Sequence, residues 1–271
     1  MNPNIGLKLL LVEDNPVNQK VTTYQLKSLG YTADVSASGQ EALQLIATTT
    51  YDIVLTNCEM PGMDGYALTA AIRRLELDQT GDRQCPTVVL AMSTDNSPSE
   101  QAKCLAVGMD DVLNKPVRKE DLALKLEQWS QKISTAKSQN LPSATQSDLR
   151  AVIGITPQDD FNPPLDWEHL HQMSDNSYEF ELELLNVFVE DTQIHLQAVK
   201  AAIAASNFWE LEQAAHHIKG ASANVGAKTM QVAAAEIEQQ ARQQKMEQAA
   251  QLVTDIEQAL SLIEKFVQEN H

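Results

Sequence analysis

The chain has 271 residues, of which 43% are hydrophobic and 5% aromatic, and its formal net charge is −17. This length suggests about two domains, and the charge argues against a nucleic-acid partner, because phosphate backbones are bound through Lys and Arg. No apolar stretch reaches the roughly 18 residues of a membrane span, and the N-terminus has no signal-peptide pattern. The three cysteines are odd in number and lack metal-binding spacing. We therefore expect a cytoplasmic protein that contacts neither nucleic acid nor membrane.

Residues 1–131 alternate short, apolar, β-branched runs with amphipathic stretches, which predicts one domain. The predicted strands are 8–14, 32–37, 52–57, 87–93 and 111–114, and the predicted helices are 16–29, 38–49, 64–77, 97–107 and 118–131. Five such βα units indicate an α/β fold with a doubly wound, five-stranded parallel sheet. Ligands of these sheets bind at the carboxyl ends of the strands.

Residues 132–164 are rich in Ser, Thr, Gln, Asn and Pro, which predicts a linker. Its short apolar run at 151–155 would either dock on a domain or stay mobile. Residues 165–271 form the second predicted domain, with 17 acidic and 6 basic side chains. Its helical periods cover 166–173, 177–204, 207–222, 227–243 and 246–268. Long helices with short connections indicate an all-α antiparallel bundle.

One helix of this bundle carries a histidine away from its apolar face. On a helical wheel the apolar face comprises Leu211, Ala214, Ala215, Ile218 and Ser222. His216 lies off that face, so we expect its ring to face solvent, with Lys219 and Gly220 beside it. A neutral imidazole is a good nucleophile near neutral pH, and Lys219 can offset the charge of phosphoryl oxygens. Glycine in mid-helix costs about 1 kcal/mol relative to alanine, which suggests that another surface approaches closely at Gly220.

The motif Ala-His-x-Ile-Lys-Gly at 215–220, followed by Ala-Ser-Ala-Asn-Val-Gly-Ala, resembles the signature of histidine-containing phosphotransfer (HPt) domains. The resemblance extends over about 165–270 and implies a four-helix bundle that needs no cofactor. It also implies that His216 is the phosphoacceptor and Lys219 its electrostatic helper, with His217 on the other flank of the helix. The implied partners are receiver domains of other response regulators or of hybrid histidine kinases. A merely solvated histidine stays open as the alternative.

Polar side chains also gather at one edge of the predicted sheet. Glu13 and Asp14 end the first strand, Asn57 ends the third, Ser93 ends the fourth and Lys115 follows the fifth. Because the carboxyl ends of parallel strands meet at one edge, we expect these five side chains to converge. Adjacent carboxylates suit Mg²⁺, and a hydroxyl with an ammonium suits a phosphoryl group.

This constellation resembles the response-regulator receiver domain, which has a flavodoxin-like fold. The matching segments, between about 7 and 130, are Leu-Val-Glu-Asp-Asn at 11–15, Asn-Cys-Glu-Met-Pro-Gly-Met-Asp-Gly at 57–65, Ala-Met-Ser at 91–93 and Lys-Pro at 115–116. In the family an aspartate at the position of Asn57 receives the phosphate. The resemblance implies that the acidic pair, residue 57 and the backbone carbonyl of Glu59 hold Mg²⁺. It also implies that Ser93 and Lys115 bind the phosphoryl oxygens.

Asn57 departs from the family pattern, because an amide is a poor nucleophile and brings one negative charge fewer to a cation. We therefore expect a receiver that takes up no phosphate and binds Mg²⁺ weakly. Val112 is a second departure, since many receivers have an aromatic residue near there, and Asp52 is too far along its strand to replace Asn57. Three explanations stay open: a natural pseudo-receiver used for docking, a cation site kept for stability, or an engineered Asp→Asn change.

Together these observations predict a two-component phosphorelay protein, a phosphotransfer intermediate and not an autonomous kinase. Its HPt domain would exchange a phosphoryl group with partner receivers through His216, and its own receiver would serve docking or regulation. One alternative is the relay part of a hybrid sensor kinase with an engineered residue 57. Another is a non-catalytic scaffold protein. A receiver that covers or exposes His216 through the linker is a further possibility.

Overall fold

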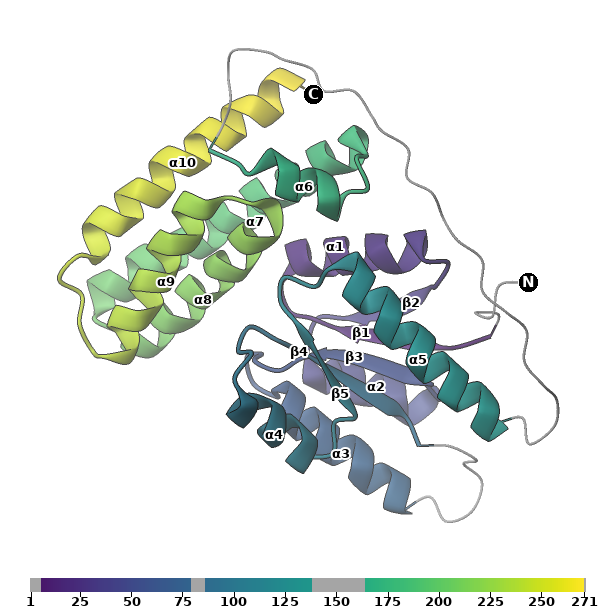
Figure 1. Ribbon diagram of the computed structural model, residues 1–271. Helices are drawn as coiled ribbons and strands as arrows, with labels where there is room; N and C mark the ends of the chain where they lie inside the picture. The colour runs from purple at the N-terminus through teal and green to yellow at the C-terminus, as the bar shows by residue number, and fades with distance from the viewer. Residues whose placement is uncertain (1–5, 79–85, 138–163, 271) are drawn as a thin grey trace.

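The computed structural model describes residues 6–78, 86–137 and 164–270, and these form an α/β domain and a helical bundle that lie side by side (Figure 1). The predicted fold class is confirmed for both parts. Among the described residues, none of the helices combines the length and the apolar composition that crossing a membrane requires.

The sheet is parallel throughout, in the order β2-β1-β3-β4-β5. Its strands are β1 (Leu9–Val12), β2 (Ala33–Ser36), β3 (Ile53–Asn57), β4 (Val88–Ser93) and β5 (Asp111–Asn114). Each lies within a run predicted from the sequence. Every residue of β1, β3 and β4 is buried, as expected of central strands covered by helices on both faces.

Two helices cover one face of the sheet and three cover the other (Figure 1). The first face packs against α1 (Pro16–Ser28) and α5 (Lys119–Lys137), and the second against α2 (Gly39–Thr48), α3 (Gly65–Asp78) and α4 (Pro98–Ala106). The last helix continues past the predicted end at residue 131, so 132–137 are helical and not linker. The apolar run 151–155 lies outside the described residues.

The bundle consists of a short helix and four long ones. They are α6 (Trp167–Met173), α7 (Tyr178–Ala205), α8 (Phe208–Val225), α9 (Lys228–Arg242) and α10 (Ala249–Asn270). The breaks between the predicted helical periods 177–204, 207–222 and 227–243 are confirmed, because Ser206 follows α7 and Gly226 follows α8, with left-handed backbone at φ 53° and 74°. Glycine adopts that conformation without strain.

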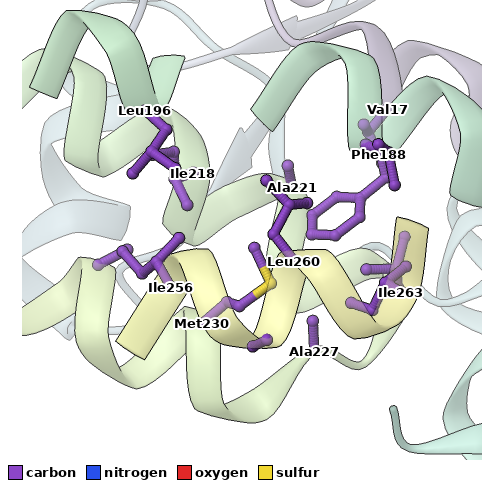
Figure 2. Packing of buried hydrophobic residues seen from close by; sticks show 14 of the residues in the cluster. Val17, Phe188, Leu196, Ile218, Ala221, Ala227, Met230, Ile256, Leu260 and Ile263 are labelled. Atoms are coloured by element: carbon purple, nitrogen blue, oxygen red, sulfur yellow. The ribbon is translucent and has the colours of Figure 1, made fainter. Parts of the chain in front are cut away.

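The core of the bundle includes two residues of the α/β domain. Val17 and Val21 of α1 are 0% and 1% exposed and belong to the bundle's apolar cluster, not to either cluster of the sheet. Figure 2 shows Val17 next to Phe188 of α7. Since α1 follows the carboxyl end of β1, this packing brings the functional edge of the sheet against the bundle.

Candidate functional site

His216 lies on α8 between two carboxylates that come from different domains. The apolar face predicted for its helix is buried as expected and comprises Leu211, Ala214, Ala215, Ile218 and Ser222. The ring places Nδ1 2.8 Å from Oε1 of Glu238 and Nε2 3.4 Å from Oε2 of Glu59. Its side chain is only 23% exposed. The ring is therefore half-buried at the edge of a cleft and less open to solvent than expected, because the α/β domain packs over this side of the bundle.

Glu238 of α9 joins the polar groups around His216 into one network. Its carboxylate is 5% exposed and also accepts hydrogen bonds from Nζ of Lys219 at 2.6 Å and from a guanidinium nitrogen of Arg242 at 2.7 Å. Burial alone would raise the pKa of Glu238, but hydrogen bonds from His216 and Lys219 and the charge of Lys219 outweigh it and lower the pKa to about 2. The carboxylate is therefore ionised at neutral pH. As an acceptor, it favours the tautomer of His216 that carries its proton on Nδ1, with the lone pair on Nε2.

His217, the neighbouring histidine, points into a different environment. Its Nε2 lies 3.0 and 3.2 Å from the two carboxylate oxygens of Asp191, and its ring stacks on His195 with centroids 3.6 Å apart. Burial would raise the pKa of Asp191, but hydrogen bonds from His195 and His217 lower it to about 2. Because the rings are nearly parallel, at 11°, their in-plane lone pairs do not converge on one cation. We interpret this trio as a structural hydrogen-bond network.

The receiver pocket gathers at the carboxyl edge of the sheet as predicted. Register places Asn57 and Ser93 at the ends of neighbouring strands, where they are 7% and 5% exposed. Nζ of Lys115 lies 2.5 Å from Oε2 of Glu13, a carboxylate that is 1% exposed. The predicted convergence of Glu13, Asp14, Asn57 and Lys115 is thus observed, with Ser93 at the next strand end.

The amide of Asn57 fills the centre of this pocket. Its Nδ2 donates to Oδ1 of Asp14 at 2.9 Å and to the backbone oxygen of Glu59 at 2.7 Å, and it lies 3.5 Å from Oε1 of Glu13. The orientation is determined, because the reversed amide would put an oxygen against these acceptors. These three acceptors are the groups expected to hold Mg²⁺, and the amide hydrogens already point at them. The residues as arranged do not fit the cation.

The backbone of Asn57 packs closely against the start of α3. A Cβ on Gly65, the first residue of α3, would lie 2.3 Å from the backbone oxygen of Asn57, so only glycine fits there. Gly220, by contrast, has room: a Cβ there would meet only Nδ2 of Asn18, at 3.8 Å. The receiver does approach Gly220, as the sequence suggested, but not so closely that glycine is required.

A cleft of about 670 Å³ separates the pocket from the histidine. Its lining includes Asp14 and Glu59 from the receiver and His216, His217 and Glu238 from the bundle. The sequence analysis identified the histidines and Asp14 but missed Glu238. The signal was its helix face, because Ala234 and Ala241, four residues before and three after it, are apolar and buried.

Comparison with family models finds a response regulator receiver domain over residues 9–127 and an Hpt domain over residues 183–266. Among curated proteins, hybrid signal transduction histidine kinase B of Dictyostelium discoideum is 38% identical over 124 residues, or 44% of this chain. Sensor histidine kinase GacS of Pseudomonas protegens is 26% identical over 226 residues, or 83% of this chain. The chain spans 6% and 23% of the length of these two relatives.

Solved structures match about half of the chain. One chain of the co-crystal structure of the Saccharomyces cerevisiae phosphotransfer protein Ypd1 with the receiver domain of Ssk1 is 25% identical, with a TM-score of 0.46. That match covers 49% of this chain and 93% of the other. The receiver domain of sensor histidine kinase PA1611 from Pseudomonas aeruginosa, with a coordinated magnesium ion, is 36% identical, with a TM-score of 0.41 and coverage of 46% and 98%. The chain therefore joins a response regulator receiver domain to an Hpt domain, the composition of a two-component phosphorelay protein related to hybrid kinases.

Proposed function

We propose that His216 accepts a phosphoryl group from the aspartyl phosphate of partner receivers and donates it to others. The observation that carries this proposal is the opposite environment of the two ring nitrogens. Nδ1 is held by the buried carboxylate of Glu238 at 2.8 Å, whereas Nε2 has no neighbour as close: it lies 3.4 Å from the largely exposed carboxylate of Glu59, and His216 lines the cleft. A ring held in this way has its nucleophilic nitrogen oriented before any partner arrives.

The chemistry at His216 needs no further reactant. The lone pair of Nε2 attacks the phosphorus of the partner's aspartyl phosphate, an N–P bond forms, and the P–O bond to aspartate breaks to regenerate its carboxylate. The ring keeps the proton on Nδ1 and gains positive charge, which the carboxylate of Glu238 offsets. Lys219 contacts the same carboxylate and can turn toward the phosphoryl oxygens. The reverse sequence returns the phosphoryl group to a receiver.

The receiver of this chain takes up no phosphate in this proposal and serves docking or regulation. The amide of Asn57 is a poor nucleophile, and its hydrogens point at Asp14 and at the carbonyl of Glu59, where a cation would bind. Mg²⁺ is coordinated in the related PA1611 receiver. Here its binding would require the amide to turn away, so we expect weak binding at most.

A phosphotransfer screen tests the role of His216. Radiolabelled, phosphorylated receivers of the source organism are mixed with the full chain, with His216→Gln, and with His217→Gln as the matched control on the same helix. We expect label on the wild type and on His217→Gln and none on His216→Gln. Equal labelling of His216→Gln and the wild type would contradict the proposal.

The match to GacS over 83% of this chain favours a second candidate, the relay part of a hybrid sensor kinase. In that case an aspartate at position 57 would pass its phosphate to His216 within the chain. Incubating Asn57→Asp with acetyl phosphate and Mg²⁺ tests this, because the label would then move from the receiver to His216. A scaffold role predicts instead that a His216→Gln strain signals normally.

A further inference from the structure

We infer that the receiver of this chain binds the HPt surface around His216 within the same molecule. A partner receiver therefore reaches the histidine only by displacing it. This inference rests on the proposed function of His216 and adds the regulation of that site. The surface is formed by α7, α8 and the turn between α6 and α7, and the occupant presents α1 and the loop after β3 (Figure 1).

The apolar part of the contact belongs to the bundle's own core. Val17 and Val21 are fully or nearly fully buried there and contribute to neither cluster of the sheet. Next to them Tyr24 stacks on Phe180, with ring centroids 3.8 Å apart at 14°, and its hydroxyl donates to the backbone oxygen of Ser174 at 2.9 Å. Separation of the domains would expose this patch to water, which favours the docked state.

Buried asparagines fix the register of the contact. Asn15 caps α1 through its Oδ1 and donates from Nδ2 to the backbone oxygen of His217 at 3.2 Å. Asn18 accepts from Nδ2 of Asn224 at 2.5 Å and donates to Oε1 of Glu13 at 2.9 Å. Both asparagines are more than nine-tenths buried. Because buried polar groups need their partners, these bonds favour one docked arrangement over others.

The docked receiver covers the reactive atom of His216. Oε2 of Glu59 lies 3.4 Å from Nε2, the nitrogen that Glu238 leaves for chemistry. A partner's aspartyl phosphate must approach this nitrogen in line, through space that Glu59 and its loop now occupy. The remaining cleft, about 670 Å³, admits a small phosphodonor but not a protein domain. Access to His216 therefore depends on the size of the donor.

Replacing Val21 by Glu in the full chain tests the inference. The side chain faces the bundle and not the sheet, so a charge there should open the contact and leave the receiver folded. Leu124→Glu, at an exposed position of α5, is the matched control. Tyr24→Ala, with Tyr24→Phe as its conservative partner, provides a second disruption if Val21→Glu does not fold.

Two measurements are made on each variant: the radius of gyration by small-angle X-ray scattering, and the rate of His216 labelling by phosphoramidate and by the donor receiver from the screen. We expect Val21→Glu to enlarge the radius and to speed labelling by the receiver at least about tenfold, with phosphoramidate labelling and the control unchanged. An unchanged radius, or an enlarged radius with an unchanged receiver rate, overturns the inference. An enlarged radius with no labelling by either donor refutes the role of His216 as phosphoacceptor. The enlarged radius would still show that the two domains are docked in the wild type.

Discussion

Asn57→Asp is the most informative single substitution in the receiver, because it tests whether the amide takes the place of a cation. In the wild type Nδ2 donates to Asp14 and to the carbonyl of Glu59. The substitution replaces this donor with a negatively charged acceptor, so that three carboxylates, at positions 13, 14 and 57, lie together while the ammonium of Lys115 contacts that of Glu13. We therefore expect a pocket that is unstable without a divalent cation.

The magnitude follows from the distances. A carboxylate oxygen in the place of Nδ2 would lie 2.9 Å from Oδ1 of Asp14. Two unit charges about 3 Å apart repel by about 5 kcal/mol at an effective dielectric constant of about 20. Side-chain rotation and partial protonation relieve part of this, so we expect a net loss of about 3 kcal/mol without cation. Mg²⁺ at about a hundred times its dissociation constant would return about 2.7 kcal/mol.

Thermal unfolding of the full chain, with EDTA or with millimolar Mg²⁺, measures this effect. The melting temperature of Asn57→Asp should fall in EDTA and recover with Mg²⁺, whereas that of the wild type should not respond to Mg²⁺. Asn57→Ala is the control, because it removes the amide without adding charge. A wild type stabilised by Mg²⁺ as strongly as Asn57→Asp would refute the reasoning.

Further predictions concern the bundle and the buried thiols. The pKa of Glu238 is lowered, so its carboxylate stabilises the folded state above the unfolded pKa near 4.5, and this contribution is lost as the pH falls toward about 2. In acid unfolding, the free energy of unfolding of Glu238→Gln should therefore depend less steeply on pH in that window. Gly220→Ala should raise helix stability by about 1 kcal/mol and leave the labelling of His216 unchanged. A loss of stability in urea unfolding would show that the added methyl group has less room than its 3.8 Å distance from Nδ2 of Asn18 indicates. Burial raises the pKa of the Cys58 thiol to about 12, so mass spectrometry should find Cys58 unmodified by iodoacetamide in the folded protein and alkylated in urea.

The strands and helices could be predicted because each type has its own pattern of apolar residues along the sequence. The central strands are runs of apolar residues, as in β1, and the bundle helices repeat apolar residues along one face, as in α8. The receiver pocket followed from strand ends alone, since parallel order brings them together. The end of α5 was placed too early, because the polar side chains after residue 131 hide the continuing apolar face, on which buried Ile133 follows Leu126 by seven residues.

The surroundings of His216 could not be predicted, because they depend on partners far away in the sequence. Glu238 lies 22 residues from His216, and Asp191 lies 26 residues from His217. The apolar residues beside Glu238 place it on the buried face of α9 but do not say which histidine it meets. Val17 and Val21 likewise have an ordinary apolar spacing, and only the structure shows that they pack into the other domain.

The docked arrangement gives a physical reason for a pocket that keeps its charged groups around Asn57. Oε2 of Glu13 binds Lys115, and Oε1 accepts from Asn18, which itself accepts from Asn224 of the bundle. Loss of the Glu13 carboxylate would leave an ammonium and a buried amide without their partner, a costly outcome in a dry interface. The acid that would hold a cation in a phosphorylated receiver thus supports a domain contact here. In the proposed docking role, the amide of Asn57 supplies the hydrogens that Asp14 and the backbone carbonyl of Glu59 accept within the same pocket.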